Sequence, residues 1–382
     1  MAFTLALPKV NISGENAMAE LVERIAGEQQ GTGLIIADPA MKNLGFLEKL
    51  CSLLDAKGLA YECFTDIIPN PTESLVNTVY DKYLEAKASY IIGFGGGSAI
   101  DTAKSIRILS NNPKPITAYN GIGLVKNVGC PLYAINTTAG TAAEVTSNAV
   151  IIDETAKIKC VIIDHNIIPD VSVNDPSIMV GIPADVTAAT GMDALTHAVE
   201  AYVSVGAHTL TNHSALESIK VIAEYLPKAV KDGQNVEARE MMAYGQFLAG
   251  MAFNSAGLGM VHAMAHPGGA HCDLPHGVCN AILLPIVCEF NRPARVAQFA
   301  KVAKAMGVNT HGMTEEEASI AAIQAIKDLS KEVGIPAGFS EFNITEEMVA
   351  QWVPDALADP CAGGNPIAMN AEQVMDLYRK SL

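Results

Sequence analysis

The stretch that decides the fold is Tyr90-Ile91-Ile92-Gly93-Phe94-Gly95-Gly96-Gly97-Ser98, followed by the segment from Ala99 to Leu109. An apolar, β-rich run enters a glycine-rich turn, and a segment typical of a helix leaves it. Glycines at such a turn let backbone N–H groups approach a phosphate, and a helix N-terminus adds a favourable dipole. The same glycines also suit a plain strand-to-helix turn, and the third glycine of the Rossmann fingerprint is not at its expected place. The segment therefore predicts a strand–turn–helix unit and leaves its ligand open.

The alternation of strands and helices continues on both sides of this segment. Further short strands are predicted at 34–37, 61–68 and 131–136, and helices at 43–57 and 74–88. Residues 150–152 and 160–163 are predicted to form a hairpin on the same sheet. Strands that alternate with helices in this way indicate βαβ units and a parallel sheet.

After Pro183 the β pattern nearly vanishes, and apolar residues recur at helical spacing. The segments with this spacing are 184–205, 211–230, 236–256, 276–290, 293–306, 314–333 and 345–358. We therefore expect two domains: an α/β domain with a Rossmann-like parallel sheet over 1–180, and an all-α domain over 181–382.

The composition excludes several classes of function. The 382 residues include 25 Lys and Arg against 41 Asp and Glu, a formal net charge of −16, which makes nucleic acid and anionic membranes poor partners. A hydrophobic fraction of 49% with 17% charged residues is typical of a large globular core. The eight cysteines are scattered without a CxxC pair, so we expect reduced thiols. With no signal-like segment and no apolar run long enough for a bilayer, the expectation is a cytoplasmic protein.

Two more polar segments follow predicted strands. Asp38 ends the first strand, where a carboxylate can accept hydrogen bonds from ribose hydroxyls and repel a 2′-phosphate, although such a residue is more often a helix cap. Thr137-Thr138-Ala139-Gly140-Thr141 follows another strand with hydroxyls and a glycine. Three such loops at one sheet edge favour a phosphate-containing ligand in a crevice there.

A second signal comes from histidines in the region predicted to be helical. Asp193 and His197 are spaced i,i+4, so both project from one helix face, and His262 and His266 repeat this spacing. Five of the nine histidines lie in or beside two such segments: His197, His262, His266, His271 and His276. A single histidine on a helix is more often a hydrogen-bonded core residue. The cluster with Asp193 nevertheless predicts a divalent metal site, and imidazole and carboxylate ligands suit Fe(II) or Zn(II) equally.

The spacing of His262 and His266 also invites comparison with HExxH metalloproteases. Ala263 stands where that mechanism requires its general-base glutamate, so the hydrolase interpretation lacks its chemistry.

Taken together, these segments resemble the iron-containing (group III) NAD-dependent alcohol dehydrogenases over nearly the whole chain. The resemblance rests on four strings: Gly95-Gly96-Gly97-Ser98 with Asp101 and Lys104; Asn136-Thr137-Thr138-Ala139-Gly140-Thr141-Ala142-Ala143-Glu144; Ala189-Thr190-Gly191-Met192-Asp193-Ala194-Leu195-Thr196-His197; and Val261-His262-Ala263-Met264-Ala265-His266-Pro267 followed by Leu274-Pro275-His276-Gly277-Val278. Within the family, the resemblance points first to the bacterial iron-type ethanol dehydrogenases and next to lactaldehyde reductase and propanediol dehydrogenase.

The resemblance implies a role for each of several residues. The metal ligands it implies are Asp193, His197, His262 and His276. His266 would lie beside the metal near the nicotinamide, where its imidazole is the candidate for relaying a proton. The implied NAD-binding residues are Asp38, Asn70, Gly96, Gly97, Ser98, Thr137, Thr138, Thr141 and Lys159. Those implied for the substrate pocket are Asn148, Phe253, Leu258 and Cys361.

The activity that the resemblance implies is an iron- and NAD-dependent interconversion of short primary alcohols and aldehydes, in a homodimer or larger homo-oligomer. Lactaldehyde reduction, propanediol oxidation, or a zinc-dependent polyol dehydrogenase of the same fold are the alternatives. Two positions depart from the family pattern. His271-Cys272 stand where relatives often have aromatic residues, and Ile286 stands where they often have histidine. His271 could offer an alternative ligand under excess metal.

Overall fold

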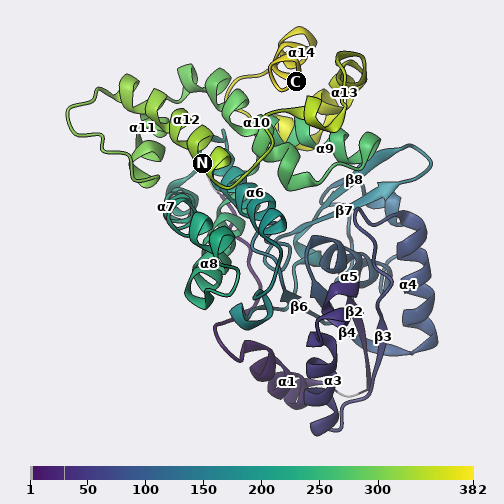
Figure 1. Ribbon diagram of the computed structural model, residues 1–382. Coiled ribbons are helices and arrows are strands. Elements are labelled where there is room, and N and C mark those ends of the chain that lie inside the picture. Colours follow the sequence, from purple (N-terminus) through teal and green to yellow (C-terminus); the bar gives the residue numbers. More distant parts are fainter. Residues whose placement is uncertain (1–2, 30) are drawn as a thin grey trace. The chain divides into compact units, whose positions relative to one another are not determined.

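The computed structural model describes residues 3–29 and 31–382, and the chain divides into two compact units (Figure 1). Unit 2 comprises 6–138 and 142–179, and unit 1 comprises residues up to Leu5, the short segment Ala139–Thr141, and Val180–Leu382. The main change of unit thus falls between Met179 and Val180, and the short segment that carries Thr141 is grouped with unit 1.

Unit 2 contains a six-stranded sheet in which every pairing is parallel. Its order is β1-β9-β6-β4-β2-β3. The strands are β1 (Val10–Ser13), β2 (Thr32–Ala37), β3 (Tyr61–Phe64), β4 (Ala88–Gly95), β6 (Leu132–Asn136) and β9 (Val171–Asn174). The predicted parallel sheet is therefore confirmed, and it gains β1 and β9, two four-residue strands that the sequence pattern did not reveal.

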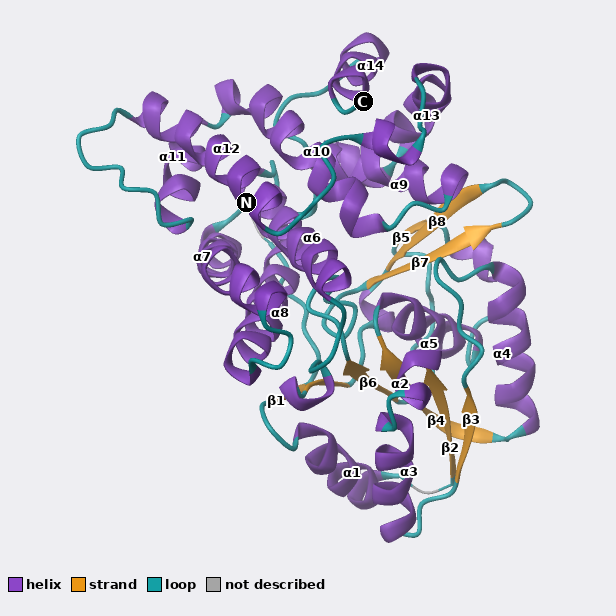
Figure 2. Ribbon diagram, in the orientation of Figure 1, coloured by secondary structure: helices purple, strands orange, loops and turns teal. Residues whose placement is uncertain are grey.

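Helices cover both faces of this sheet (Figure 2). On one face, Leu34, Ile36 and Ile91 pack with residues of α4 (Glu73–Glu85) and α5 (Gly97–Leu109). Alternate strand residues on the other face pack against α1 (Ala17–Glu28) and α3 (Phe46–Ala56); the short helix α2 (Pro39–Asn43) precedes α3. Burial on both faces explains why these strands are continuous apolar runs rather than alternating ones.

The predicted hairpin exists, but its predicted place in the main sheet is wrong. Strands β7 (Asn148–Asp153) and β8 (Ile158–Ile163) pair antiparallel, and with β5 (Gly121–Ile122) they form a separate three-stranded sheet. Its inward side chains, including Ile151 and Ile162, share a core with Ala103 and Ile106 of α5. The hairpin thus packs on a helix that already covers the main sheet, so it cannot also extend that sheet.

Unit 1 is helical from residue 184 onward, so the predicted all-α region is confirmed (Figure 2). Two of its helices, Met260–Cys272 and Ala371–Lys380, lie outside the segments that the 3–4 spacing predicts. Its α-helices are α6 (Ala184–Val203), α7 (Thr209–Lys231), α8 (Val236–Ala256), α9 (Met260–Cys272), α10 (His276–Asn291), α11 (Val296–Ala305), α12 (Glu315–Glu332), α13 (Glu346–Ala358) and α14 (Ala371–Lys380). Helix α6 is buried along most of its length, and its Gly191 lets Leu226 of α7 approach closely.

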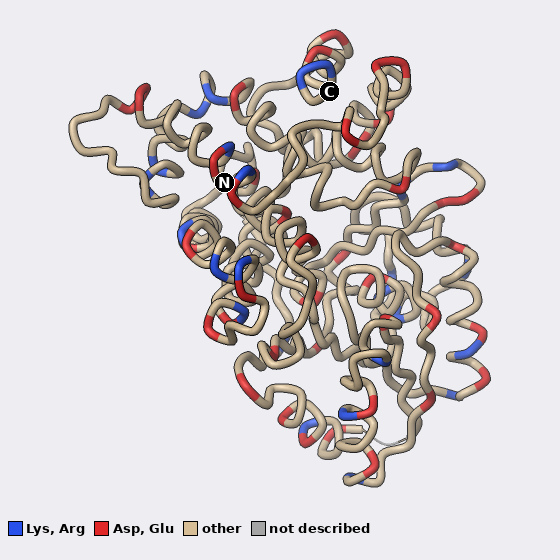
Figure 3. The backbone as a smooth tube through the Cα atoms, viewed as in Figure 1, with Lys and Arg blue, Asp and Glu red and all other residues tan. Residues whose placement is uncertain are grey.

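No single helix in the described part of the chain is long and apolar enough to cross a membrane; α8 and α9 pass that test only as a pair bent by 105°. Acidic and basic residues are interspersed along the helices of both units (Figure 3).

Candidate active site and metal centre

The glycine-rich turn after β4 is held by a side chain from the neighbouring strand. The Gly96 amide donates a 2.7 Å hydrogen bond to Oδ2 of Asp38, which follows β2. At Gly95, φ is +155°, and a Cβ there would lie only 2.1 Å from the same oxygen. Only glycine lets the backbone approach Asp38 this closely, so the backbone forms a tight turn, here called the glycine cradle, at the N-terminus of α5. Burial raises the pKa of Asp38, and the Gly96 amide opposes that rise.

The loop after β6 joins the same edge. The Thr137 amide donates to the Gly95 carbonyl at 3.1 Å, and the Thr138 side chain lies 3.2 Å from where a Cβ on Gly96 would stand. The structure thus brings Asp38, Gly96, Thr137 and Thr138 together at the carboxyl ends of β2, β4 and β6. Small residues and unhindered helix amides at such an edge suit a pyrophosphate, so this cradle fits a dinucleotide.

The other residues implied for the cofactor have separate places. Gly97 and Ser98 form the first turn of α5, Asn70 has a φ of +49° in the loop before α4, and Lys159 is on β8. The positive charge of Lys159 is one of the influences that lower the pKa of Asp101. Asn148, implied for the substrate pocket, starts β7, and its carbonyl accepts a 2.6 Å hydrogen bond from Lys104.

Lys104 and Asp101, both part of the glycine-turn string, lie three residues apart on α5, with Lys104 buried and Asp101 partly buried. Asp101 accepts from the Val150 amide at 3.1 Å, and burial raises its pKa to about 6. Burial lowers the pKa of Lys104 to about 8, and the charges of Asp101 and Glu144 oppose that fall. Their partners lie on β7, so this pair fastens the hairpin to the helix that begins at the cradle.

In unit 1, three of the four implied metal ligands converge. Asp193 of α6, His262 of α9 and His276 at the start of α10 present one ligand atom each, all within 4.8 Å of one another. Nε2 of His262 and Nε2 of His276 each lie 3.7 Å from Oδ1 of Asp193. A Cβ on Gly277 would lie 2.3 Å from the Ala189 carbonyl, so glycine after His276 lets α10 start against α6.

The amide of Asn280 shows where these ligand atoms point. Its Nδ2 lies 2.7 Å from Oδ1 of Asp193 and 3.1 Å from Nε2 of both His262 and His276. An amide nitrogen donates and does not accept, and its two hydrogens cannot satisfy three acceptors, so the three atoms face one common point that lacks a full set of donors. Two imidazole nitrogens and a carboxylate oxygen are donors that Fe(II) and Zn(II) both accept, so the residues fit a divalent metal.

His197, the fourth implied ligand, lies one helical turn after Asp193. Its ring stacks on His262, with ring centroids 4.5 Å apart, and on Phe253, with centroids 4.3 Å apart. Burial lowers its pKa to about 4, against the opposing charge of Asp193, so the imidazole is neutral as a metal ligand must be.

His266, the implied proton relay, has its own carboxylate. Its Nδ1 lies 2.6 Å from Oδ2 of Asp359, and its ring stacks on that of His276 with centroids 5.3 Å apart. Burial raises the pKa of Asp359, but the charge and hydrogen bond of His266 outweigh it and bring the value to about 2. Oδ1 of Asp359 also accepts from the amide of Cys361, a residue implied for the substrate pocket. Phe253 and Leu258, implied for the same pocket, are both buried.

Three polar residues around these histidines escaped the sequence analysis: Glu200, Asn280 and Asp359. Glu200 of α6 binds Nδ1 of His262 at 2.6 Å, and burial raises its pKa to about 7. A signal was present in each case, since Glu200 lies seven residues after Asp193, Asn280 lies four after His276, and Asp359 lies two before Cys361. Each therefore falls on a helix face or turn that already carries a candidate residue.

The predicted alternative ligand His271 is engaged elsewhere. Its Nε2 lies 2.7 Å from Oδ2 of Asp355, and its side chain is 32% exposed. No disulfide joins any of the eight cysteines, all of which belong to the described residues.

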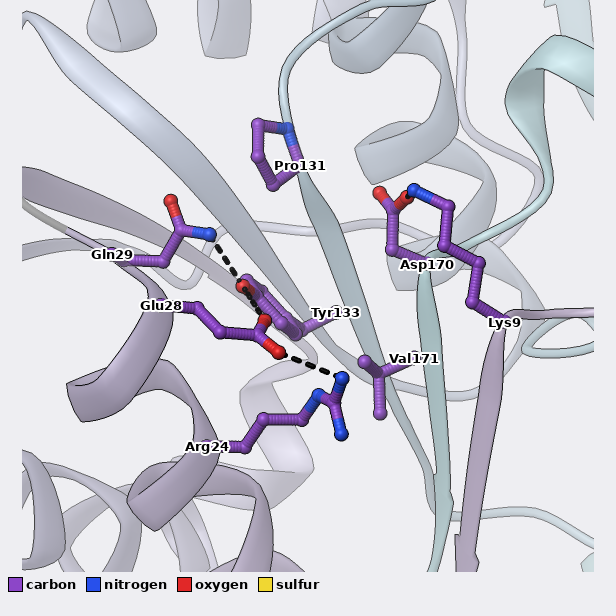
Figure 4. A pocket seen from close by; sticks show the side chains of 8 residues that line it. All are labelled: Lys9, Arg24, Glu28, Gln29, Pro131, Tyr133, Asp170 and Val171. Carbon is purple, nitrogen blue, oxygen red and sulfur yellow. Dashed lines mark hydrogen bonds and ion pairs between the residues drawn. The ribbon is translucent and has the colours of Figure 1, made fainter.

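A cavity of about 200 Å³ opens at the amino ends of β6 and β9, the opposite edge from the glycine cradle (Figure 4). Its charges neutralise one another: Lys9 pairs with Asp170 at 2.7 Å, and Arg24 with Glu28 at 2.7 Å. The residues that line it include no histidine, cysteine or serine, so this cavity is not a candidate catalytic site.

Comparison with known proteins bears on both regions. A family model described as iron-containing alcohol dehydrogenase matches residues 8–176, and one described as the C-terminal part of the Fe-containing alcohol dehydrogenase family matches 187–382. The chain is 38% identical to an NAD-dependent methanol dehydrogenase of Bacillus methanolicus, covering 98% of this chain and 99% of the relative. It is 39% identical to lactaldehyde reductase of Escherichia coli K12, covering 99% of each. A solved structure of 1,3-propanediol oxidoreductase matches with a TM-score of 0.98 at 39% identity, covering 100% of both chains.

Proposed function

The chain belongs to the iron-containing alcohol dehydrogenase family, and from this premise we propose that it interconverts short primary alcohols and aldehydes with NAD. The observation that carries the proposal is the convergence of Asp193, His262 and His276 on one point, with His266 and its carboxylate beside them. The name of the Bacillus methanolicus relative supports NAD as the cofactor.

The proposed division of labour follows the two units. Residues 1–180 form the NAD-binding domain, in which Asp38, Gly96, Gly97 and Ser98 hold the ribose and pyrophosphate. The other residues proposed for NAD are Asn70, Thr137, Thr138, Thr141 and Lys159. Residues 181–382 form the metal- and substrate-binding domain. This assignment is supported by the cradle of backbone at the start of α5 and by the converging ligand atoms of α6, α9 and α10.

The proposed metal ligands are Asp193, His197, His262 and His276. A bound divalent metal supplies a Lewis acid that lowers the pKa of an alcohol hydroxyl. His266 moves the proton: its Nδ1 is occupied by Asp359, which leaves Nε2 to accept the proton and pass it to solvent. Phe253, Leu258, Cys361 and Asn148 are the residues proposed to contact the substrate. Mostly apolar groups favour a short alcohol, and the amide of Asn148 could bind a second hydroxyl.

A second candidate substrate class is supported by the relatives. Lactaldehyde reductase and 1,3-propanediol oxidoreductase are named for substrates that carry a second oxygen function. Oxidation of a diol or reduction of a hydroxyaldehyde is therefore the alternative activity. A cytoplasmic homodimer or larger homo-oligomer completes the proposal, and light scattering on the purified chain tests the oligomeric state.

One experiment tests the function. The chain is purified without oxygen, its metal is measured by elemental analysis, and NADH formation is followed with ethanol, propanol, 1,2-propanediol, 1,3-propanediol and glycerol. About one iron per chain with oxidation of ethanol or propanol is the expected result. Oxidation of the propanediols alone selects the second candidate, and stoichiometric zinc with activity on glycerol alone contradicts the proposal.

A further inference from the structure

Glu200 ties helix α6 to the first turn of α9. It lies on the same face of α6 as Asp193 and His197, and its side chain is only 4% exposed. Oε2 lies 2.6 Å from Nδ1 of His262, and Oε1 accepts the amide of Val261 at 2.7 Å. Both carboxylate oxygens are thus used at one place, beside the histidine that faces Asp193 and His276.

The start of α9 needs such a partner. The residue before the helix is Gly259, which has no side chain to cap it, and the first amides of a helix have no partner within it. Glu200 supplies the acceptor from another helix, and a negative charge at a helix N-terminus is also favoured by the dipole. A Cβ on Gly259 would lie 2.9 Å from Oε1, so glycine is what admits the carboxylate. The position of Glu200 is therefore fixed by the fold.

This contact sets the proton of His262. A carboxylate only accepts hydrogen bonds, so the hydrogen of the neutral imidazole is on Nδ1. Nε2 then carries the lone pair, on the side where Asn280 Nδ2 lies 3.1 Å away and Oδ1 of Asp193 lies 3.7 Å away. A metal ligand needs that lone pair, and a carboxylate behind the ring makes it more basic.

The charge of this region also calls for a cation. Glu200 and Asp193 are both buried, and among the described residues their ion-pair partners are histidines rather than lysine or arginine. A divalent cation at the point that Asn280 marks would supply the positive charge that neither a lysine nor an arginine brings to these carboxylates.

We propose that Glu200 is a positioning residue of the metal centre: its hydrogen bond holds His262 in the Nδ1–H form, so that the lone pair of Nε2 faces the point shared with Asp193 and His276. The inference rests on the ligand set of the proposed function. Asp359 offers a matched control, because it binds Nδ1 of His266 at the same 2.6 Å but serves an imidazole outside that set.

The test uses the full chain stripped of metal, with Co(II) alone as the probe and a chelator of known affinity as competitor. Glu200→Gln keeps the shape of the side chain but replaces one carboxylate oxygen by an NH2 group. That group faces a hydrogen-bond donor, either the Val261 amide or Nδ1–H of His262, so one of the two hydrogen bonds is lost. We expect Co(II) to bind about 10- to 100-fold more weakly, with a shifted visible spectrum, as for other residues behind a metal ligand. Asp359→Asn is expected to keep the wild-type Co(II) affinity and spectrum.

Wild-type affinity and spectrum in folded Glu200→Gln overturn the proposal. If that variant does not fold, Glu200→Asp retains the charge but is too short to reach both donors, and wild-type Co(II) binding by it overturns the proposal equally. Asp193→Ala distinguishes failure of the proposed ligand set from failure of the role proposed for Glu200. If it still binds Co(II) normally, the ligand set fails; if it loses Co(II) while Glu200→Gln does not, only the role of Glu200 fails.

Discussion

At the carboxyl edge of the six-stranded sheet, the Gly96 amide is bonded to Asp38, and the groups offered to a ligand are the backbone amides at the start of α5, which no side chain caps. The histidine cluster of unit 1 offers side-chain nitrogens and a carboxylate oxygen instead. Removing atoms disables a side-chain site, whereas a backbone site is disabled by adding them. Substitutions that shorten side chains in unit 1 and lengthen them in unit 2 therefore test the two proposals from opposite directions.

The largest effect is expected from Asp193→Ala, which removes the one carboxylate among the converging ligand atoms. The imidazoles of His262 and His276 remain at the point that Asn280 marks, but a dication there has lost the carboxylate that faces it. We expect elemental analysis to find less than about a tenth of the wild-type metal, and activity to fall at least about 1,000-fold, since the Lewis acid is worth several kcal/mol. A metal-free variant with full activity contradicts the assignment of the site.

His266→Ala is expected to separate proton transfer from metal binding. The imidazole lies beside the ligands without belonging to them, so metal content should stay at the wild-type level while kcat falls about 100-fold, the lower end for a lost general acid–base group. Asp359→Asn leaves the His266 ring in place but weakens its 2.6 Å hydrogen bond, so the kcat of this variant should lie between those of the wild type and His266→Ala. Loss of stoichiometric metal from His266→Ala would show instead that His266 is a ligand.

The difference between the regions also explains what the sequence could reveal. The glycine turn is a local pattern, and it predicted a ligand-binding edge of the sheet. The paired histidines are a local pattern too, and they predicted a set of metal ligands of which three converge in the structure. The hairpin was placed in the wrong sheet because alternation identifies a strand but not its neighbours. Glu200 and Asp359 were missed because their histidine partners lie 62 and 93 residues away. The helix face or turn that each shares with a candidate residue indicates its neighbourhood, but no local pattern identifies the distant histidine that it binds.

Adding a single carbon tests the backbone site. Gly96 has an extended backbone that alanine can adopt, and its Cβ would stand 3.2 Å from Thr138, so Gly96→Ala should fold. The methyl group would occupy space through which a pyrophosphate approaches, and we expect NAD to bind about 10-fold more weakly, a loss of about 1.4 kcal/mol. Metal content is expected to stay unchanged. Gly95→Ala provides the contrast, since its Cβ meets Asp38 at 2.1 Å and should lower thermal stability itself.

The smallest effect is expected from removing the charge of Asp38, the side chain that holds the glycine turn. Its carboxylate has two separable roles: the hydrogen bond from Gly96 needs only an oxygen, whereas repulsion of a 2′-phosphate needs the charge. Asp38→Asn keeps the first and removes the second, so the ratio of kcat/KM for NADP to that for NAD should rise about 5-fold, the effect of about 1 kcal/mol between unit charges 4 Å apart in water. Asp38→Gly removes both, so both cofactors should bind more weakly while the ratio rises equally. If neither substitution changes the ratio, Asp38 only holds the glycine turn, and discrimination between the cofactors resides elsewhere at this edge.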